Sequence, residues 1–333
     1  MQATYQKAWL SLIAIVLSAV LLAACGNNEK DKTAGDTGSK DKESESYTVE
    51  HAMGTTEVPK KPEKVVILTN EGTEALLAMG VKPVGAVKSW LGDPWYDHIS
   101  DEMTDVEVVG DESALNVEAI AALKPDLIIG NKMRQEDQYE KLSKIAPTVY
   151  AETLRGDWKE NFNFYAKALN REEEGKKVLA DYDARIADIK AKAGDKLDQE
   201  ISVVRFMAGI TRIYYKDTFS GVILEELGFA RPANLEKLFS DNPDDLFVRE
   251  VTKELIPEMD GDYLFYFTYA PAETKADAEK QAEEFTNDPL WKNLDAVKAG
   301  KAYQVDDAIW NTAGGVKAAN LMLDELEKIV LEK

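Results

Sequence analysis

Cationic, aromatic and amide side chains follow several apolar segments that have the composition of buried strands. Arg205 interrupts the apolar segment 201–207, and Arg134 follows the segment 127–129. A guanidinium group presents two parallel N–H donors to a carboxylate, and aromatic faces cover the apolar parts of a ligand. Ligands of parallel sheets bind at the strand ends. We therefore expect an oxygen-rich ligand in contact with nine side chains: Arg205, Trp310, Arg134, Trp90, Tyr269, Asn311, Lys88, Met207 and Phe267.

Most of these residues also have an alternative interpretation. A charge inside an apolar strand is costly unless it is paired, so Arg205 could form an ion pair with a nearby carboxylate. Trp95 or Trp158 could take the place of Trp90. Residues such as Tyr269, Phe267 and Met207 are more often part of a core than of a pocket, and exposure to solvent would explain Arg134 and Lys88.

The composition argues against several classes of function. The 333 residues include 40 basic and 61 acidic side chains, and the net charge of −21 repels phosphate backbones, so no nucleic-acid partner is expected. One cysteine cannot form an internal disulfide, a Cys-rich zinc site or a cysteine-ligated iron–sulfur cluster. With only His51 and His98, histidine-rich metal chemistry is poorly supported. We expect neither a cofactor nor a metal ion ligated by the protein.

An enzyme on a doubly wound fold is the alternative from a different functional class. The first predicted strand is followed by LTNEGTEALLAMG, which lacks the G-x-G-x-x-G fingerprint of dinucleotide binding. The chain also has neither a G-x-S-x-G nucleophile elbow nor a phosphate loop. Composition leaves a carboxylate enzyme open, but no motif supports one.

The first 46 residues are predicted to be a targeting segment followed by a tether. The apolar segment 9–24 is short for a membrane span and ends in LAAC, small residues that lead into the only cysteine and resemble a bacterial lipobox. We interpret residues 1–24 as a signal peptide, Cys25 as the lipidated N-terminus and 25–46 as a flexible polar tether. The alternative is a signal-anchor helix with an incidental cysteine.

Alternating strand and helix signals predict two similar α/β lobes. Runs such as 65–68 and 127–129 are typical of strands buried on both faces, and helix signals lie between them. This order predicts parallel strands with right-handed crossovers. The phrases EALLAMGVKPVG and VILEELGFARPA occur in the two halves and favour a second lobe of the same kind, on which a final helix over 315–332 is expected to pack.

A single long helix is predicted between the lobes. The segment 171–193 has no proline and has apolar residues at helical spacing; Asn170 with Glu173 would cap its start, and Gly194 would end it. The predicted organisation is an N-terminal lobe over 47–157, linking helices over 158–195 and a C-terminal lobe over 196–333.

The ordered set of motifs resembles one known family. LAAC, VEAIAALKPDLIIG, the long helix and KAYQVDDAIWNTAGG resemble the substrate-binding lipoproteins of iron–siderophore ABC importers. The resemblance implies a class III periplasmic-binding-protein fold, in which two Rossmann-like α/β lobes are joined by a single long α-helix around a shallow cleft. It is closest to Gram-positive proteins that bind ferric schizokinen and arthrobactin, which are hydroxamate–citrate siderophores.

The resemblance also implies partners and a location. A captured ferric siderophore would be delivered to a membrane permease and its ATPase, on the extracytoplasmic face of the cell membrane, where a lipid on Cys25 would hold the chain. Members of the family dock with one acidic residue per lobe, and the matching positions are Glu136 and Glu225. An aromatic residue near Trp310 lines the family's pocket. Because the siderophore itself surrounds the iron, the protein need not ligate the metal.

One further kind of binding protein stays open, and a second is argued against by the scarcity of histidine. Heme usually takes a His or Tyr axial ligand, for which Tyr269 or Tyr214 could serve, so a heme or cobalamin binding lipoprotein of the same fold is the second candidate. A zinc or manganese binding lipoprotein would need several His or carboxylate ligands at one point, and His51, one of two histidines, lies near the tether.

Overall fold

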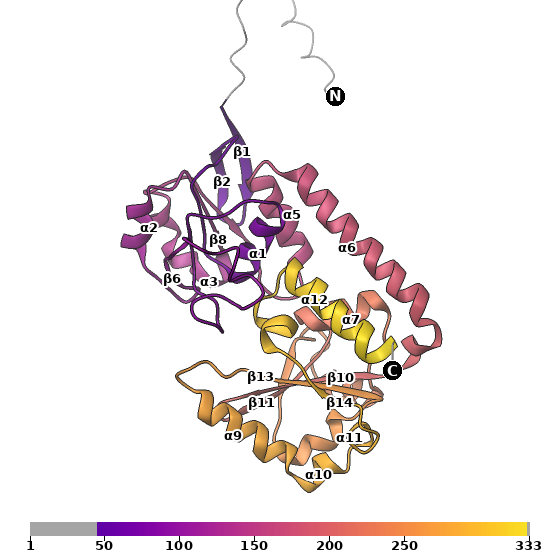
Figure 1. Ribbon diagram of the computed structural model, residues 1–333. Helices are drawn as coiled ribbons and strands as arrows, with labels where there is room; N and C mark the ends of the chain where they lie inside the picture. The colour runs from indigo at the N-terminus through magenta and orange to yellow at the C-terminus, as the bar shows by residue number, and fades with distance from the viewer. Residues whose placement is uncertain (1–44, 332–333) are drawn as a thin grey trace, which may run out of the picture. The chain divides into compact units, whose positions relative to one another are not determined.

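The computed structural model describes residues 45–331 (Figure 1). The predicted signal peptide, the lipidation site at Cys25 and almost all of the tether lie outside the described residues. Within residues 45–331, no helix combines the length and hydropathy that crossing a membrane requires.

The N-terminal lobe is built on a five-stranded parallel sheet, as the strand–helix alternation predicted. Apart from the edge strand over 107–108, its strands are buried, which suits a sheet covered on both faces. Their order is β5 (Glu107–Val108), β4 (Gly85–Ala86), β3 (Val65–Ile67), β8 (Leu127–Asn131) and β9 (Thr148–Ala151). Two small antiparallel pairs accompany it: β1 (Ser46–His51) with β2 (Gly54–Pro59), and β6 (Gly110–Asp111) with β7 (Ala114–Leu115).

The C-terminal lobe is built on a second five-stranded sheet, which is mixed rather than parallel. The order is β12 (Val248–Glu250), β11 (Ile210–Tyr214), β10 (Ile201–Met207), β13 (Tyr263–Thr268) and β14 (Ala302–Gln304). β10, β13 and β14 pair in parallel, but β11 pairs antiparallel with both β10 and β12. The reason is local: only two residues separate β10 from β11, a connection that allows a hairpin and is too short for a crossover. The expectation of two lobes of the same kind is therefore wrong for this edge of the second sheet.

Short helices surround both sheets. Those of the N-terminal lobe are α1 (Asn70–Ala78), α2 (Val117–Leu123), α3 (Lys132–Gln135), the 3₁₀ turn η1 (Glu136–Gln138), α4 (Tyr139–Leu142) and α5 (Trp158–Ala168). Those of the C-terminal lobe are α7 (Phe219–Leu227), α8 (Ala233–Phe239), the 3₁₀ segment η3 (Lys253–Met259), α9 (Lys275–Thr286), α10 (Pro289–Lys292) and α11 (Asp295–Lys298).

The long helix is present as α6 (Glu172–Ala193) and packs against α5 and α7 (Figure 1). Gly194 ends it as predicted and leads into the 3₁₀ turn η2 (Gly194–Asp198), but the predicted cap at its start is wrong. Arg171 occupies the N-cap position but makes no capping hydrogen bond with its side chain, which pairs with Glu174. Asn170 instead has φ of 54° and donates to the Lys60 carbonyl oxygen. Asn170 thus turns the chain between α5 and α6, a role its tolerance of left-handed backbone allows.

The final helix joins the lobes instead of covering only the second one. A π-helical turn, η4 (Ala308–Thr312), precedes α12 (Val316–Leu326), and a second, η5 (Glu327–Leu331), follows it. α12 packs on α1 and α5 of the N-terminal lobe as well as on η4. One hydrophobic cluster accordingly runs through residues of both sheets and α12, for example Ile67, Phe265 and Met322. The predicted lobe boundaries, 47–157 and 196–333, stay a prediction.

Candidate functional site

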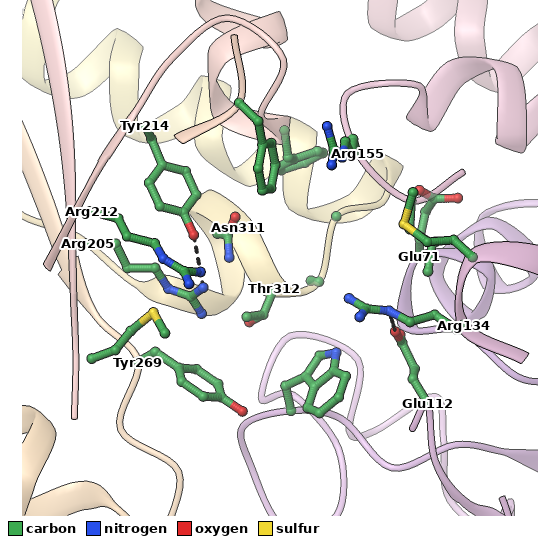
Figure 2. A pocket seen from close by; sticks show the side chains of 18 residues that line it. Glu71, Glu112, Arg134, Arg155, Arg205, Arg212, Tyr214, Tyr269, Asn311 and Thr312 are labelled. Atoms are coloured by element: carbon green, nitrogen blue, oxygen red, sulfur yellow. Dashed lines mark hydrogen bonds and ion pairs between the residues drawn. The ribbon is translucent and has the colours of Figure 1, made fainter. Parts of the chain in front are cut away.

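A cavity of about 430 Å³ is lined by residues that follow or end strands of both sheets. Its volume lies in the range typical of small-molecule sites. Figure 2 shows the two walls: Arg205, Arg212, Tyr214 and Tyr269 come from the C-terminal lobe, and Glu71, Glu112 and Arg134 come from the N-terminal lobe. Asn311 and Thr312, just before α12, also line it.

The wall of the C-terminal lobe is organised by a buried ion pair. Arg205 lies near the carboxyl end of β10, and its Nε and Nη2 donate to the two carboxylate oxygens of Asp307 at 2.6 and 3.0 Å. Its Nη1 donates to the hydroxyl of Tyr214 at 2.9 Å, and its guanidinium carbon lies 4.7 Å from the ring centre of Tyr269. The side chains of Arg205 and Asp307 are only 9% and 1% exposed, so this pair is desolvated.

Burial disfavours the charged form of both Arg205 and Asp307, and the contact between the two groups decides whether they are ionised. Burial disfavours the charged guanidinium, but the Asp307 carboxylate and the Tyr214 hydroxyl outweigh it, so the pKa of Arg205 is raised. Burial raises the pKa of the Asp307 carboxyl, and the neighbouring charge of Arg205 acts to lower it. The bidentate geometry, with two N–H donors on two oxygens, is that of an ionised pair.

Strand register places a second arginine beside the first. Arg205 of β10 lies opposite Arg212 of β11, and Arg212 lies opposite Glu250 of β12. Like charges directly opposite each other repel. Each guanidinium is therefore matched with its own carboxylate: Arg212 Nη2 contacts Glu250 Oε1 at 2.7 Å, while Arg205 contacts Asp307.

The opposite wall holds two buried carboxyl groups, those of Glu112 and Glu71, which are hydrogen-bonded to polar neighbours. Glu112 Oε1 accepts hydrogen bonds from the backbone and side-chain nitrogens of Asn70 at 2.7 and 2.9 Å, and its Oε2 lies 3.5 Å from Arg134 Nε. Glu71 accepts from the Tyr165 hydroxyl at 3.0 Å and from Asn161 Nδ2 at 3.3 Å. Burial raises the pKa of Glu112 and raises that of Glu71 well above its ordinary value.

A fourth cavity arginine is held more loosely. Arg155 lies in the segment between β9 and α5, and its guanidinium carbon is 4.8 Å from the ring centre of Phe247. Its Nη1 is 4.0 Å from Asp245 Oδ1, the longest of the four arginine–carboxylate contacts around the cavity. The side chain is about half exposed. Arg155 and Arg134 are thus the cavity cations that an incoming anion can engage without breaking a close ion pair.

The structure brings six of the nine predicted ligand contacts to the cavity: Arg205, Arg134, Trp90, Tyr269, Asn311 and Met207. Whether they contact a ligand stays a prediction. Arg205 combines both interpretations considered for it, since it lines the cavity and also forms the structural ion pair.

The remaining three predicted contacts lie away from the cavity lining. Trp310 is completely buried, stacks on Phe265 with ring centres 4.6 Å apart, and donates to Glu325 at 2.6 Å. Phe267 is completely buried against Tyr214, and Lys88 is exposed. The π-helical turn η4 carries Trp310 into the core and not to the cavity.

Sequence reasoning missed four charged residues of the cavity: Glu71, Glu112, Arg155 and Arg212. Arg212 had a usable signal, because a hairpin from 201 to 214 places it opposite Arg205. The rest lie in a helix start or in connecting segments, where a charged residue is ordinarily solvated.

The two predicted docking residues are both on the surface. Glu136 begins η1 and is exposed, and Glu225 on α7 is exposed and 3.1 Å from Lys216 Nζ. Of the candidate heme ligands, Tyr214 and Tyr269 both line the cavity, and the Tyr214 hydroxyl is engaged by Arg205. Within residues 45–331, no three His, Cys, Asp or Glu side chains are grouped to hold a metal ion.

The chain is similar to known proteins over almost its whole length. A family model described as periplasmic binding protein matches residues 65–309. The chain is 52% identical over 328 residues to the probable siderophore-binding lipoprotein YfiY of Bacillus subtilis, covering 98% of this chain and 99% of that one. It is 30% identical to the Fe(3+)-citrate-binding protein YfmC of B. subtilis, covering 99% of each. Staphylococcus aureus SirA complexed with staphyloferrin B has a TM-score of 0.77 at 40% identity, covering 85% of this chain and 97% of that one.

Removing one member of the Arg205–Asp307 pair should destabilise the fold. Arg205→Ala leaves the Asp307 carboxylate buried without its partner, and we expect the free energy of unfolding to fall by about 3–5 kcal/mol. The double variant Arg205→Met with Asp307→Leu removes both charges and should recover most of that loss. Urea unfolding followed by circular dichroism measures both. A single variant as stable as the unchanged protein would contradict the structural role of the pair.

Glu71 should make stability depend on pH. Because burial raises its pKa in the folded protein, the unfolded carboxyl ionises first as pH rises, and stability is lost between the unfolded and the folded pKa values. Glu71→Gln mimics the neutral carboxyl, so its stability relative to the unchanged protein should increase in urea unfolding as the pH rises above about 4, where the unfolded carboxyl begins to ionise. Glu63→Gln, at an exposed position, is the matched control. A difference that stays constant with pH refutes this prediction.

Proposed function

The chain belongs to the periplasmic binding protein family, and from this premise we propose that it is the extracytoplasmic solute-binding component of an ABC importer for a ferric siderophore. The observation that carries the proposal is the cavity, to which both lobes contribute arginines and aromatic rings. The siderophore is captured there and delivered to the membrane permease and its ATPase. The names of the relatives YfiY and SirA–staphyloferrin B support this ligand class.

The charges around the cavity favour a ligand with carboxylate or hydroxamate oxygens. Arg134 and Arg155 have long contacts to their carboxylates, at 3.5 and 4.0 Å, so both can turn their N–H donors to an anion. Arg205 is held by Asp307 and contributes mainly by holding Tyr214 and Tyr269 in place. This arrangement suits a hydroxamate or hydroxamate–citrate siderophore, and the name of the Fe(3+)-citrate-binding relative supports the citrate part.

The iron itself needs no ligand from the chain in this proposal, since a siderophore occupies the metal's coordination sphere. Trp90, Tyr269 and Met207 then cover apolar parts of the chelate, and Asn311 offers amide hydrogen bonds. A lipid on Cys25 holds the protein at the outer face of the cell membrane, and residues 25–46 act as the tether.

The loosely held arginines should dominate affinity. A charge-assisted hydrogen bond is worth about 1.5–3 kcal/mol, so Arg134→Ala and Arg155→Ala should each weaken binding of ferric schizokinen about tenfold or more. Quenching of intrinsic tryptophan fluorescence during titration measures the Kd. Arg171→Ala, at a surface arginine paired with Glu174 at the start of α6, is the matched control and should leave the Kd within about twofold.

The same titration discriminates between ligand classes. Absence of quenching by ferric hydroxamates and ferric citrate, together with a Soret band after addition of hemin, would replace the proposed ligand by heme. Ligand binding that is unchanged in both Arg134→Ala and Arg155→Ala would remove these residues from the site.

Docking to the permease should depend on one acid of each lobe. We expect the charge reversals Glu136→Arg and Glu225→Arg to leave the siderophore Kd unchanged, because both side chains are exposed and neither lines the cavity. Uptake of ⁵⁵Fe-loaded siderophore by cells should fall in each variant. Glu63→Arg, another exposed acid of the N-terminal lobe, is the control. Normal uptake in both docking variants refutes the assignment.

A further inference from the structure

A buried carboxylate of α1 caps the start of α12. Glu74 is completely buried, and its Oε2 accepts hydrogen bonds from the backbone N–H groups of Lys317 and Ala318, both at 2.9 Å. The N-cap residue, Gly315, has no side chain to satisfy these donors. A carboxylate distant in sequence therefore supplies the cap that α12 lacks, and it also complements the positive end of the helix.

A second set of contacts holds the same turn. Glu74 Oε1 lies 2.5 Å from His98 Nε2, and the His98 ring stacks on Tyr96 with ring centres 5.6 Å apart. Lys317 Nζ reaches Glu102 Oε1 at 2.7 Å. Residues of the N-terminal lobe thus contact both the backbone of the first turn of α12 and the side chain of Lys317.

Gly315 is required here by space and not by backbone conformation. Its φ of −115° is open to any residue. A Cβ atom at this position would lie 2.6 Å from Glu74 Oε2 and 2.7 Å from Glu74 Cβ, closer than such contacts occur. The backbone of residue 315 and the side chain of Glu74 are therefore fitted to one another, and a methyl group must displace one of them.

This contact lies directly beside the ligand cavity. Asn311, Thr312 and Gly314 line the cavity, and the chain enters α12 immediately after them. The same segment starts next to Asp307, which Arg205 of the C-terminal lobe holds. The cavity segment 307–315 is therefore fixed at one end by the C-terminal lobe and at the other end by Glu74 of the N-terminal lobe.

We propose that Glu74 is a positioning residue for the ligand cavity: by capping α12 it holds the segment 311–314 in place and fixes the spacing of the two lobes around the ligand. Glu74 itself does not line the cavity. The affinity readout of this inference rests on the proposed function, whereas the lobe-spacing readout does not.

The affinity test compares variants that keep or remove the cap. Glu74→Leu leaves two buried N–H groups without an acceptor, and Gly315→Ala pushes the carboxylate away, so both should weaken ferric schizokinen binding about tenfold or more. Glu74→Gln retains an amide oxygen as acceptor and should stay within about threefold. Glu102→Gln removes the charge only from the exposed contact between Glu102 and Lys317 and is the matched control.

A distance measurement separates positioning from simple loss of stability. Spin labels on Glu118→Cys of α2 and Lys280→Cys of α9, in the full chain carrying Cys25→Ser, report the spacing of the lobes by pulsed electron paramagnetic resonance. Without ligand, the distance distribution should broaden or shift in Gly315→Ala and Glu74→Leu, but not in Glu102→Gln. Circular dichroism selects temperatures at which each variant is folded.

The outcomes test the role of Glu74 separately from the proposed binding of a ferric siderophore. If Glu74→Leu does not fold, Gly315→Ala and Glu74→Gln still decide the inference. An unchanged distance distribution together with an unchanged Kd in Gly315→Ala overturns it. If the unchanged protein binds no ferric siderophore, the proposed function fails, while the spacing measured in the ligand-free protein still tests the role of Glu74.

Discussion

The buried contact between Arg205 and Asp307 is the constraint on which the cavity depends. It joins the central strand of the second sheet to the segment after β14, and through Nη1 and the guanidinium face it also holds Tyr214 and Tyr269. A buried ion pair is weak evidence for stability, because desolvation offsets much of the attraction. Its geometry nevertheless allows few alternatives, so it specifies where the cavity wall lies.

The cavity combines strong charge with local neutralisation. Every arginine that lines it has a carboxylate within about 4 Å, so each guanidinium is neutralised before any ligand arrives. The contacts grade from the close Arg205–Asp307 pair to the loose Arg155–Asp245 pair. Arginines in close pairs, such as Arg205, hold the cavity wall in place. Arginines in loose pairs, such as Arg155, can exchange a protein carboxylate for a ligand oxygen. Such an exchange costs least where the original pair is exposed and long.

Two helices with different roles connect the lobes. α6 packs against α5 and α7, and its 22 residues form one uninterrupted helix, with acidic residues in its first turn and lysines in its last that complement the helix dipole. α12 is tied to the N-terminal lobe by the Glu74 cap and to the C-terminal lobe by η4. The predicted family, and with it the two-lobed α/β fold, is confirmed, and both connections belong to a protein whose cavity is formed by both lobes.

The sequence by itself was enough to predict features that depend on local order: the α6 segment and its end at Gly194, the parallel first sheet, and Arg205 as an unusual charge inside a strand. Helical periodicity and strand hydrophobicity are patterns of residues that lie close together in the sequence. Only the tertiary structure decided which groups meet. Arg205 finds Asp307 102 positions away, Trp310 turns into the core through a π-helical turn, and Gly315 is glycine because Glu74 occupies the space of a Cβ. Such pairings depend on how distant segments pack, and no local pattern records them.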